Sequence, residues 1–301
     1  MRLLPALARH SKRPHISAVV VSRNEGEWLR RTVEELARTL PRASEIVVVD
    51  DGSDDGSADF LAAGRPEARL LRTSGLGVAR ARNLGARKSA GEVIIFADAH
   101  LELRAGWWQP LVDVLRRPNA GAAAPAVADM ANREAFGYGF TLGAADLVPH
   151  WLKQLDQAPF HAPILPGCCL AMTREVFQRT GGFDRGLKSR GGIDAETGVR
   201  FWLQGYENWV VPESRVWHLF RTSAPFRVKR AEVIHNRLRL AYLHFNRQRV
   251  KEVRQALAED PAFDRALQLV ERSEAATRRR NLLATRVHDD CWFFREFGIS
   301  W

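Results

Sequence analysis

The sequence predicts an α/β protein built on a doubly wound sheet. Three short apolar runs rich in β-branched residues predict buried parallel strands: Ile16–Val21, Glu45–Val49 and Val93–Phe96. Between the first two runs, apolar residues recur at helical spacing as far as Pro41, which predicts a helix. A strand, a helix and a strand at this spacing form a βαβ unit. With 301 residues, 46% of them hydrophobic, the chain can bury a full-sized core.

The next elements continue this alternation. Leu70–Arg72 predicts a weak third strand, and the glycine-rich turn at Gly75–Gly77 opens a helix that Gly91 ends. After the strand that begins at Val93, we expect a helix over Trp107–Leu115 and a strand of small residues that begins at Ala120.

The middle of the chain is less regular. Residues 132–160 show little periodicity, so we expect an irregular segment that borders a pocket. A strand is expected within Pro163–Met172, followed by a helix with Thr173 as its N-cap. The run Gly191–Thr197 leads into a further helix, and Trp209–Val211 predicts a strand that the following proline ends.

The composition changes after residue 225. Residues 226–286 are basic and favour helix, and Pro261 is expected to divide them into two helices. The aromatic end, residues 288–297, is expected to pack onto the core or onto a partner. Residues 226–301 are therefore predicted to form a basic helical extension.

The formal net charge of +10 favours an anionic partner, which could be a nucleotide phosphate, a nucleic acid or an acidic membrane surface. An arginine-rich proteome would give the same charge without any such partner. The basic helices lack a recognisable nucleic-acid-binding signature, so no nucleic-acid partner is expected. No apolar stretch reaches about 18 residues, and Met1–His15 lacks the long apolar core of a signal peptide, so no transmembrane segment is expected.

The three cysteines favour a reducing compartment. Cys168 and Cys169 are adjacent, and adjacent cysteines rarely bridge each other, which leaves Cys291 without an obvious partner. No spacing typical of a zinc site is present. We therefore expect a cytoplasmic protein.

The strand at Val93–Phe96 runs out into Asp98 and His100, which are two residues apart. In extended backbone such residues point to the same side. Open α/β sheets bind ligands at the carboxyl ends of their strands. The two side chains could therefore both face one ion, and our working hypothesis is a divalent-metal site that holds the diphosphate of a sugar nucleotide.

Two further groups of polar residues favour a nucleotide site. Asp50 and Asp51 end the second strand, where a carboxylate could accept hydrogen bonds from a base or a ribose. The alternative is that the Asp/Gly/Ser run after this strand only forms turns and helix caps. Arg80 and Arg82 lie in the first turns of the helix after the glycine-rich turn, a position that suits phosphate binding.

Several motifs together resemble a known family. Val19–Glu25 followed by Val48–Ser53 resembles the opening of family-2 glycosyltransferases with the GT-A fold. Four further motifs resemble the catalytic domain of the polypeptide N-acetylgalactosaminyltransferases and their bacterial relatives. These motifs are Gly77–Arg82, Phe96–His100, Gly191–Glu196 and Trp217–Arg221. The resemblance covers roughly Ile16–Arg221. It implies a GT-A catalytic domain with a doubly wound mixed sheet over residues 1–225, followed by the helical extension.

The resemblance also implies roles for individual residues. The nucleotide and diphosphate would be bound by Ser22, Arg23, Glu25, Asp50, Asp51, Arg80, Gly167 and Arg221. The metal ligands would be Asp98, His100 and His218. Asp194 falls on the position of the catalytic base in inverting enzymes, and Glu196 on a nearby acid that contacts the donor sugar or the acceptor. The mammalian peptide enzymes carry a Glu-Asn pair where this chain has Ile193-Asp194, which is closer to the inverting pattern.

These observations lead to one function hypothesis and two rivals. The hypothesis is a metal-dependent glycosyltransferase that moves a sugar from a UDP-sugar to a peptide, natural-product or glycan acceptor, with inversion and Asp194 as base. A carboxylate with imidazoles suits Mn²⁺ better than Mg²⁺, which is the alternative ion. The rivals are a nucleotide- or nucleic-acid-binding protein without transferase activity, and a sugar nucleotidyltransferase.

Overall fold

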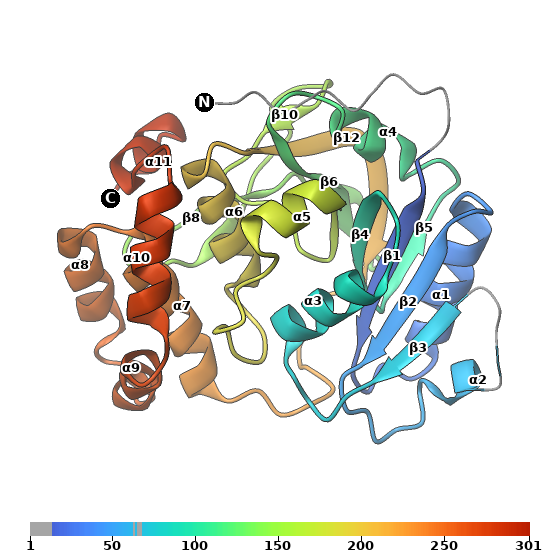
Figure 1. Cartoon of the computed structure of the whole chain (residues 1–301), viewed down its shortest axis with the longest axis horizontal. Helices are drawn as coiled ribbons and strands as arrows, with labels where there is room; N and C mark the ends of the chain where they lie inside the picture. The colour runs from blue at the N-terminus through green and yellow to red at the C-terminus, as the bar shows by residue number, and fades with distance from the viewer. Residues whose placement is uncertain (1–13, 63, 65–67) are drawn as a thin grey trace.

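The computed structural model describes residues 14–62, 64 and 68–301 (Figure 1). No signal peptide is expected in Met1–His15 from the sequence, and most of this stretch lies outside the described residues. A ten-stranded mixed sheet forms the centre of the described part. Its strands follow one another in the order β10 (Phe160–His161), β12 (Glu207–His218), β6 (Ala120–Asp129), β11 (Cys169–Thr173), β4 (Val93–Asp98), β1 (Ile16–Ser22), β2 (Glu45–Asp50) and β3 (Ala68–Arg72), with β5 (Leu101–Leu103) beside β12 and β7 (Asn132–Gly137) beside β6.

The predicted strands are confirmed, and their pairing is parallel. β1 lies between β2 and β4 and is parallel to both, and β2 is parallel to β3. β11 is antiparallel to β4 and to β6, which makes the sheet mixed. β4 continues beyond Phe96 as far as Asp98, so this carboxylate ends a central strand.

Alternate residues of β1 enter two different cores. Ile16, Ala18 and Val20 pack in a cluster with residues of α1 (Glu27–Thr39). Val19 packs in another cluster with residues of α3 (Val78–Lys88), α5 (Arg174–Thr180) and α6 (Ile193–Leu203). Because successive side chains of a strand point to opposite faces, helices cover both faces of the sheet, as predicted (Figure 1). Two shorter helices, α2 (Asp59–Ala62) and α4 (Gln109–Val114), complete this region.

Residues 132–160 differ from the irregular segment that was expected. β7 pairs with β6, and β8 (Phe140–Leu142) forms a hairpin with β9 (Pro149–Trp151). The strands are short, and glycines interrupt the alternation from which a strand is predicted. Gly137 is one of them, and the Trp151 ring explains it: a Cβ at this position would lie 2.2 Å from the ring.

The strand predicted at Trp209–Val211 is much longer than expected. β12 passes through Pro212 and continues to His218. Its register with β6 shifts between Val211 and Arg215. Prolines within a sheet are found at such irregularities, because there the missing backbone N–H does not interrupt the regular hydrogen bonding of the strand.

The helical extension has more helices than predicted. Figure 1 shows them gathered at one side of the sheet, and they are α7 (Arg230–His244), α8 (Arg247–Leu257), α9 (Phe263–Glu271), α10 (Ala275–Thr285) and α11 (Asp290–Glu296). Pro261 separates α8 from α9, but the prediction of two helices is wrong because further breaks occur. One lies at Asn246, whose side chain caps α8 by accepting a hydrogen bond from the Arg249 backbone N–H.

The aromatic end of the chain packs onto the core, as predicted. Phe293 and Phe294 of α11 are buried in one cluster with Trp202 of α6 and Leu243 of α7. Buried apolar contacts therefore join the extension to the rest of the chain. Among the described residues, no helix combines the length and the apolar character that crossing a bilayer requires.

Candidate active site

A cavity of about 330 Å³ lies at the carboxyl ends of the central strands. Its walls come from the ends of β1, β4 and β12, the start of α3, the loop before α6 and the segment after β12. Nine of the thirteen predicted site residues line it: Arg23, Glu25, Asp51, Asp98, His100, Gly167, Asp194, His218 and Arg221. The cavity is thus where the strand-end argument places a ligand.

Asp98, His100 and His218 come together in this cavity. One ligand atom from each lies within 4.8 Å of the others. His218 Nε2 is 3.3 Å from Asp98 Oδ2, and the two imidazole rings have centroids 4.6 Å apart. The pairing of β12 with β5 sets His218 opposite Leu101, which brings residues far apart in the sequence to one corner.

The donor set fits a divalent ion. One carboxylate and two imidazoles are ligands for divalent transition metals, of which Mn²⁺ is one. His100 Nδ1 lies 2.9 Å from Glu25 Oε2, an outer contact that orients the ring and leaves its Nε2 for a ligand. The Nδ1 atom of His218 is buried and has no hydrogen-bond partner among the described residues.

Arg82 holds Asp98 in its ionised form. Its Nη2 donates to Asp98 Oδ1 at 3.0 Å and to the carbonyl of Gly167 at 2.7 Å. Burial raises the pKa of Asp98, but the hydrogen bond from His218 and the charge of Arg82 outweigh it, so the pKa lies below its usual range. The sequence indicated Arg82 only for phosphate binding and did not predict its contact with Asp98, although Arg82 shares the buried face of α3 with Ala79 and Ala86.

Arg80 does not reach the site. It is exposed, and its Nε donates to the carbonyl of Arg185 at 2.8 Å. On a helix, residues two apart do not share a face. Arg82 therefore points into the cavity while Arg80 points away from it.

The two acids that end β2 also separate. Asp51 lines the cavity, and its carboxylate accepts hydrogen bonds from the backbone N–H groups of Leu76 and Gly77 at 2.6 and 2.8 Å. Asp50 accepts from the Ser53 N–H at 3.0 Å and pairs with Arg72, outside the cavity. Neighbouring residues of a strand point to opposite sides, which explains the difference.

Glu25 links the metal corner to the segment after β12. Its side chain is 7% exposed, and Oε2 lies 2.7 Å from Arg221 Nη2 as well as near His100. Arg23 lies with its guanidinium 5.2 Å from the centroid of the Phe226 ring. Ser22 is buried and does not line the cavity; its carbonyl accepts a hydrogen bond from the Asp51 N–H.

Asp194 faces the cavity from the first turn of α6. Its Oδ2 accepts a hydrogen bond from the Gly167 N–H at 3.1 Å. Burial raises the pKa of this carboxyl group. Gly167 must lack a side chain, because a Cβ there would lie 2.0 Å from Asp194 Oδ1.

Glu196 lies elsewhere. It is completely buried and pairs with Arg200 at 2.9 Å and with His244 at 3.2 Å. The structure therefore places Glu196 away from the donor and acceptor contacts that the resemblance implied. The spacing that puts Asp98 and His100 on one side of extended backbone puts Asp194 and Glu196 on different sides of a helix.

Sequence reasoning missed part of the cavity wall. Residues 189–192 line the cavity, and Arg190 among them was not predicted as a site residue. Cys168 also lines it, but burial raises the pKa of its thiol, which therefore stays protonated. The hairpin of β8 and β9 reaches the rim through Trp151, whose ring lies edge-on to Phe220 at 6.1 Å.

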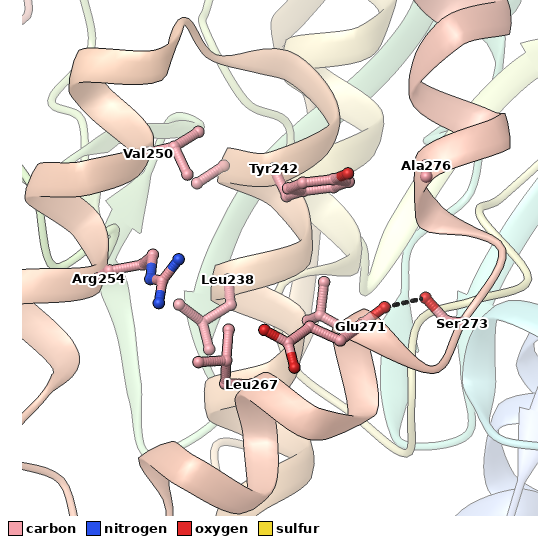
Figure 2. Close-up of a pocket in the computed structure, with 10 residues that line it drawn as sticks. Leu238, Tyr242, Val250, Arg254, Leu267, Glu271, Ser273 and Ala276 are labelled. Atoms are coloured by element: carbon pink, nitrogen blue, oxygen red, sulfur yellow. Dashed lines mark hydrogen bonds between the residues drawn. The ribbon is translucent and has the colours of Figure 1, made fainter.

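A second cavity, of about 170 Å³, lies within the helical extension (Figure 2). It is lined by Leu238, Leu267 and other apolar side chains, together with the charged side chains of Arg254 and Glu271. Its lining contains no imidazole and only one carboxylate, so among the described residues the candidate metal ligands all lie in the first cavity.

The sequence matches the model of a known family. "Glycosyl transferase family 2" matches residues 17–181. Human polypeptide N-acetylgalactosaminyltransferase 10 is 32% identical over 285 residues, which cover 84% of this chain and 47% of that protein. N-acetylgalactosaminyltransferase 6 of Drosophila melanogaster is 30% identical over 264 residues, which cover 81% of this chain and 38% of that protein. The chain thus spans less than half the length of these relatives.

Solved structures share the fold. A crystal structure of GalNAc-T7 with UDP, GalNAc and Mn²⁺ aligns with a TM-score of 0.75 at 22% identity and covers 96% of this chain and 57% of that one. The mannosyltransferase PcManGT from Pyrobaculum calidifontis, in complex with GDP-Man and Mn²⁺, aligns with a TM-score of 0.53 at 19% identity and covers 91% of this chain and 86% of that one.

Proposed function

The chain belongs to glycosyl transferase family 2 and has the GT-A fold that its sequence predicts, and from this we propose that it is a metal-dependent glycosyltransferase that uses a UDP-sugar. The observation that carries the proposal is the cluster of Asp98, His100 and His218, which lines a cavity at the carboxyl ends of the central strands. The names of the relatives support sugar transfer, and the Mn²⁺ and UDP in the GalNAc-T7 structure support the choice of ion and nucleotide. The proposed acceptor is a peptide, a natural product or a glycan.

Asp98, His100 and His218 would hold the metal ion, which supplies positive charge for the departing diphosphate. The chain adds further positive charge through Arg221, which faces the same cavity. Glu25 orients both His100 and Arg221, because its carboxylate contacts both. Arg82 keeps Asp98 ionised, the form that binds a cation.

Asp51 and Arg23 would bind the nucleoside. Asp51 fixes the glycine-rich turn Gly75–Gly77 at one wall of the cavity through two backbone hydrogen bonds. Arg23 lies beside Phe226, so a planar base could stack at this edge.

Asp194 is the proposed base of an inverting reaction. As the acceptor oxygen forms its bond to the anomeric carbon, the bond to the diphosphate breaks and Asp194 takes the proton of the acceptor hydroxyl. Two observations support this role: Asp194 faces the cavity, and burial raises its pKa toward the range useful for a base.

The proposal is tested by release of UDP from a panel of UDP-sugars with Mn²⁺ and a mixture of peptide and glycan acceptors. Asp98→Asn should abolish Mn²⁺-dependent release, whereas Asp113→Asn, at an exposed carboxylate of α4, should not. Release that persists in Asp98→Asn would remove the metal assignment. Pyrophosphate formed from UTP and a sugar phosphate would instead favour a nucleotidyltransferase.

The anomeric configuration of the product, measured by NMR, tests the stereochemistry. A β-linked product from an α-linked donor is expected. An α-linked product would remove Asp194 from the role of base.

We further propose a cytoplasmic location. All three cysteines are unpaired, which is typical of a reducing compartment. Fractionation of cells that express the tagged chain would test this.

A further inference from the structure

Asn236 of α7 connects the helical extension to the wall of the candidate active site. Its side chain is completely buried. Its Oδ1 accepts a hydrogen bond from the Lys188 N–H at 2.9 Å, and its Nδ2 donates to the carbonyls of Lys188 and Gly191 at 2.8 and 2.7 Å. The residues held in this way lead into 189–192, which line the cavity directly before Asp194.

The amide of Asn236 has no hydrogen-bonding capacity left over. His235 Nδ1 lies 3.0 Å from Asn236 Oδ1, and burial lowers the pKa of this histidine, so its neutral ring donates from Nδ1. An amide oxygen accepts two hydrogen bonds and an amide nitrogen donates two, and all four are used here. The orientation of the amide is therefore fixed on both sides.

The loop that Asn236 holds has an unusual backbone. Ser189, Gly191 and Gly192 have φ values of 34°, 84° and 74°, in the left-handed region that side chains disfavour. Such conformations persist only when their surroundings determine them. The Ser189 carbonyl accepts from the Val78 N–H at 3.3 Å, so the loop is held between α3 on one side and Asn236 on the other.

A shift of this loop would move the start of α6. The Gly192 carbonyl accepts the Glu196 N–H at 3.0 Å, which is a hydrogen bond of the first turn of α6. Asp194 lies in that turn. In the described part of the chain the Asn236 side chain forms hydrogen bonds with Lys188, Arg190, Gly191 and His235, and with none of the predicted nucleotide and metal residues.

We infer that Asn236 is a positioning residue for sugar transfer. It fixes the backbone of residues 188–192, and this backbone in turn fixes the position of Asp194. The reaction named in this inference rests on the proposed function, whereas the fixing of the loop does not. The extension is then a working part of the active site, because one of its helices sets the geometry of a cavity wall.

The test compares Asn236→Asp with a matched control, Asn208→Asp. Asn208 in β12 is also buried, and it also donates two hydrogen bonds to backbone carbonyls, those of Pro163 and Gly198. Asn236→Asp removes both donors and sets a carboxylate against two carbonyl oxygens. We would measure kcat and KM for the UDP-sugar, the affinity for UDP with Mn²⁺, and the hydrogen–deuterium exchange of residues 188–193.

Asn236→Asp should lower kcat about 100-fold, because a small displacement of a reacting group has an effect of this size. KM and the affinity for UDP should stay close to wild type, and exchange in 188–193 should speed up. Asn208→Asp should leave kcat and the exchange of this loop unchanged. Equal effects of the two variants on kcat, a wild-type exchange rate in the loop, or a parallel loss of UDP affinity would each overturn the inference.

Two further arms keep the test decisive. If Asn236→Asp does not fold, Asn236→Ser shortens the side chain without adding charge and is measured in the same way, with the same outcomes. If the wild-type chain releases no UDP from any donor, the proposed function fails, and the exchange of residues 188–193 still shows whether Asn236 holds the loop.

Discussion

Two groups of charged side chains in this protein have the same chemistry but different surroundings. The first, the cavity cluster, consists of Glu25, Arg82, Asp98, His100, His218 and Arg221. The second, the sealed cluster, consists of Asp184, Glu196, Arg200, Arg239, His244 and Arg278. Both combine carboxylates, guanidinium groups and imidazoles.

The two clusters differ in access to solvent at their central carboxylates, because Asp184 and Glu196 are only 1% and 0% exposed, although Arg278 at the edge of the sealed cluster is 25% exposed. The side chains of Asp98 and Arg221 in the cavity cluster are 30% and 21% exposed. In the sealed cluster the Arg239 side chain is 0% exposed, and it forms a two-pronged contact with the two oxygens of Asp184 at 2.6 and 3.0 Å. A carboxylate whose lone pairs are occupied inside the protein joins elements together, whereas one that faces a cavity can bind a ligand.

The comparison shows that residue types alone do not identify the functional cluster. The sealed cluster joins α7 and α10 of the extension to α6 and to the loop at Asp184. Its role is to hold the extension in place, and through it Asn236. The following predictions test whether the cavity cluster determines the rate of the reaction and the sealed cluster determines the stability of the fold.

The largest effect on kcat is expected when the two acids of α6, Asp194 and Glu196, are each replaced by the corresponding amide. Because Asp194 is the proposed base, Asp194→Asn should lower kcat by about 10²–10⁴-fold, the usual contribution of a general base. Glu196→Gln should leave kcat near wild type, since Glu196 belongs to the sealed cluster. Initial rates of UDP release at saturating donor would measure both. A larger loss of kcat in Glu196→Gln than in Asp194→Asn would reverse the assignment of the two acids.

The sealed cluster should show its importance in stability. Arg239→Ala leaves the buried Asp184 without its two-pronged partner and should lower the free energy of unfolding by about 3–5 kcal/mol. Arg254→Ala is the control, because Arg254 is an exposed arginine of α8 in the same helical extension and has no ion pair in the described part of the chain. It should change the free energy by less than about 0.5 kcal/mol. Urea denaturation measures the free energy of unfolding of both variants. Equal midpoints would contradict the proposed role of the sealed cluster in stability.

The sequence predicted what depends on local geometry. The strands around β1 follow from their apolar runs, and the shared direction of Asp98 and His100 follows from the alternation of extended backbone. His218 came only from the family resemblance, because the pairing of β12 with β5 cannot be calculated from local spacing.

The sequence could not predict contacts between segments that are far apart along the chain. Arg239 and Asp184 are 55 residues apart, and neither lies in a motif. The role of Glu196 came only from the family resemblance, and the turn of the helix between Asp194 and Glu196 directs Glu196 to Arg200 and His244 instead of the cavity. The number of helices in the extension was underestimated because Pro261 was the only break considered.

Removal of one imidazole from the cavity cluster should have an intermediate effect. His218→Ala should lower the rate of UDP release about 100-fold and raise the Mn²⁺ concentration needed for half-maximal rate, because a metal ion supplies several kcal/mol to such a reaction. His150→Ala, at an exposed histidine of β9, is the control. His218→Ala should lose far less stability than Arg239→Ala. An unchanged Mn²⁺ dependence would separate His218 from the metal.

The smallest effect concerns the pH dependence of stability. Burial raises the pKa of Glu196, but Arg200 and His244 outweigh it, so its pKa in the folded chain lies well below the usual range. As the pH falls, the unfolded chain binds this proton first, near pH about 4.3, so the free energy of unfolding decreases by up to about 1.4 kcal/mol per pH unit. Burial lowers the pKa of His244, so its similar loss begins higher, below about pH 6.5.

Glu196→Gln should therefore have a flatter stability profile than wild type below about pH 4.3, while both chains still lose stability as the pH falls from about 6.5. Urea denaturation at half-unit steps from neutral to acid pH would measure the two slopes. Equal slopes at the acid end would mean that Glu196 is not held ionised by its partners. The stability of the sealed cluster would then depend chiefly on the contact between Asp184 and Arg239.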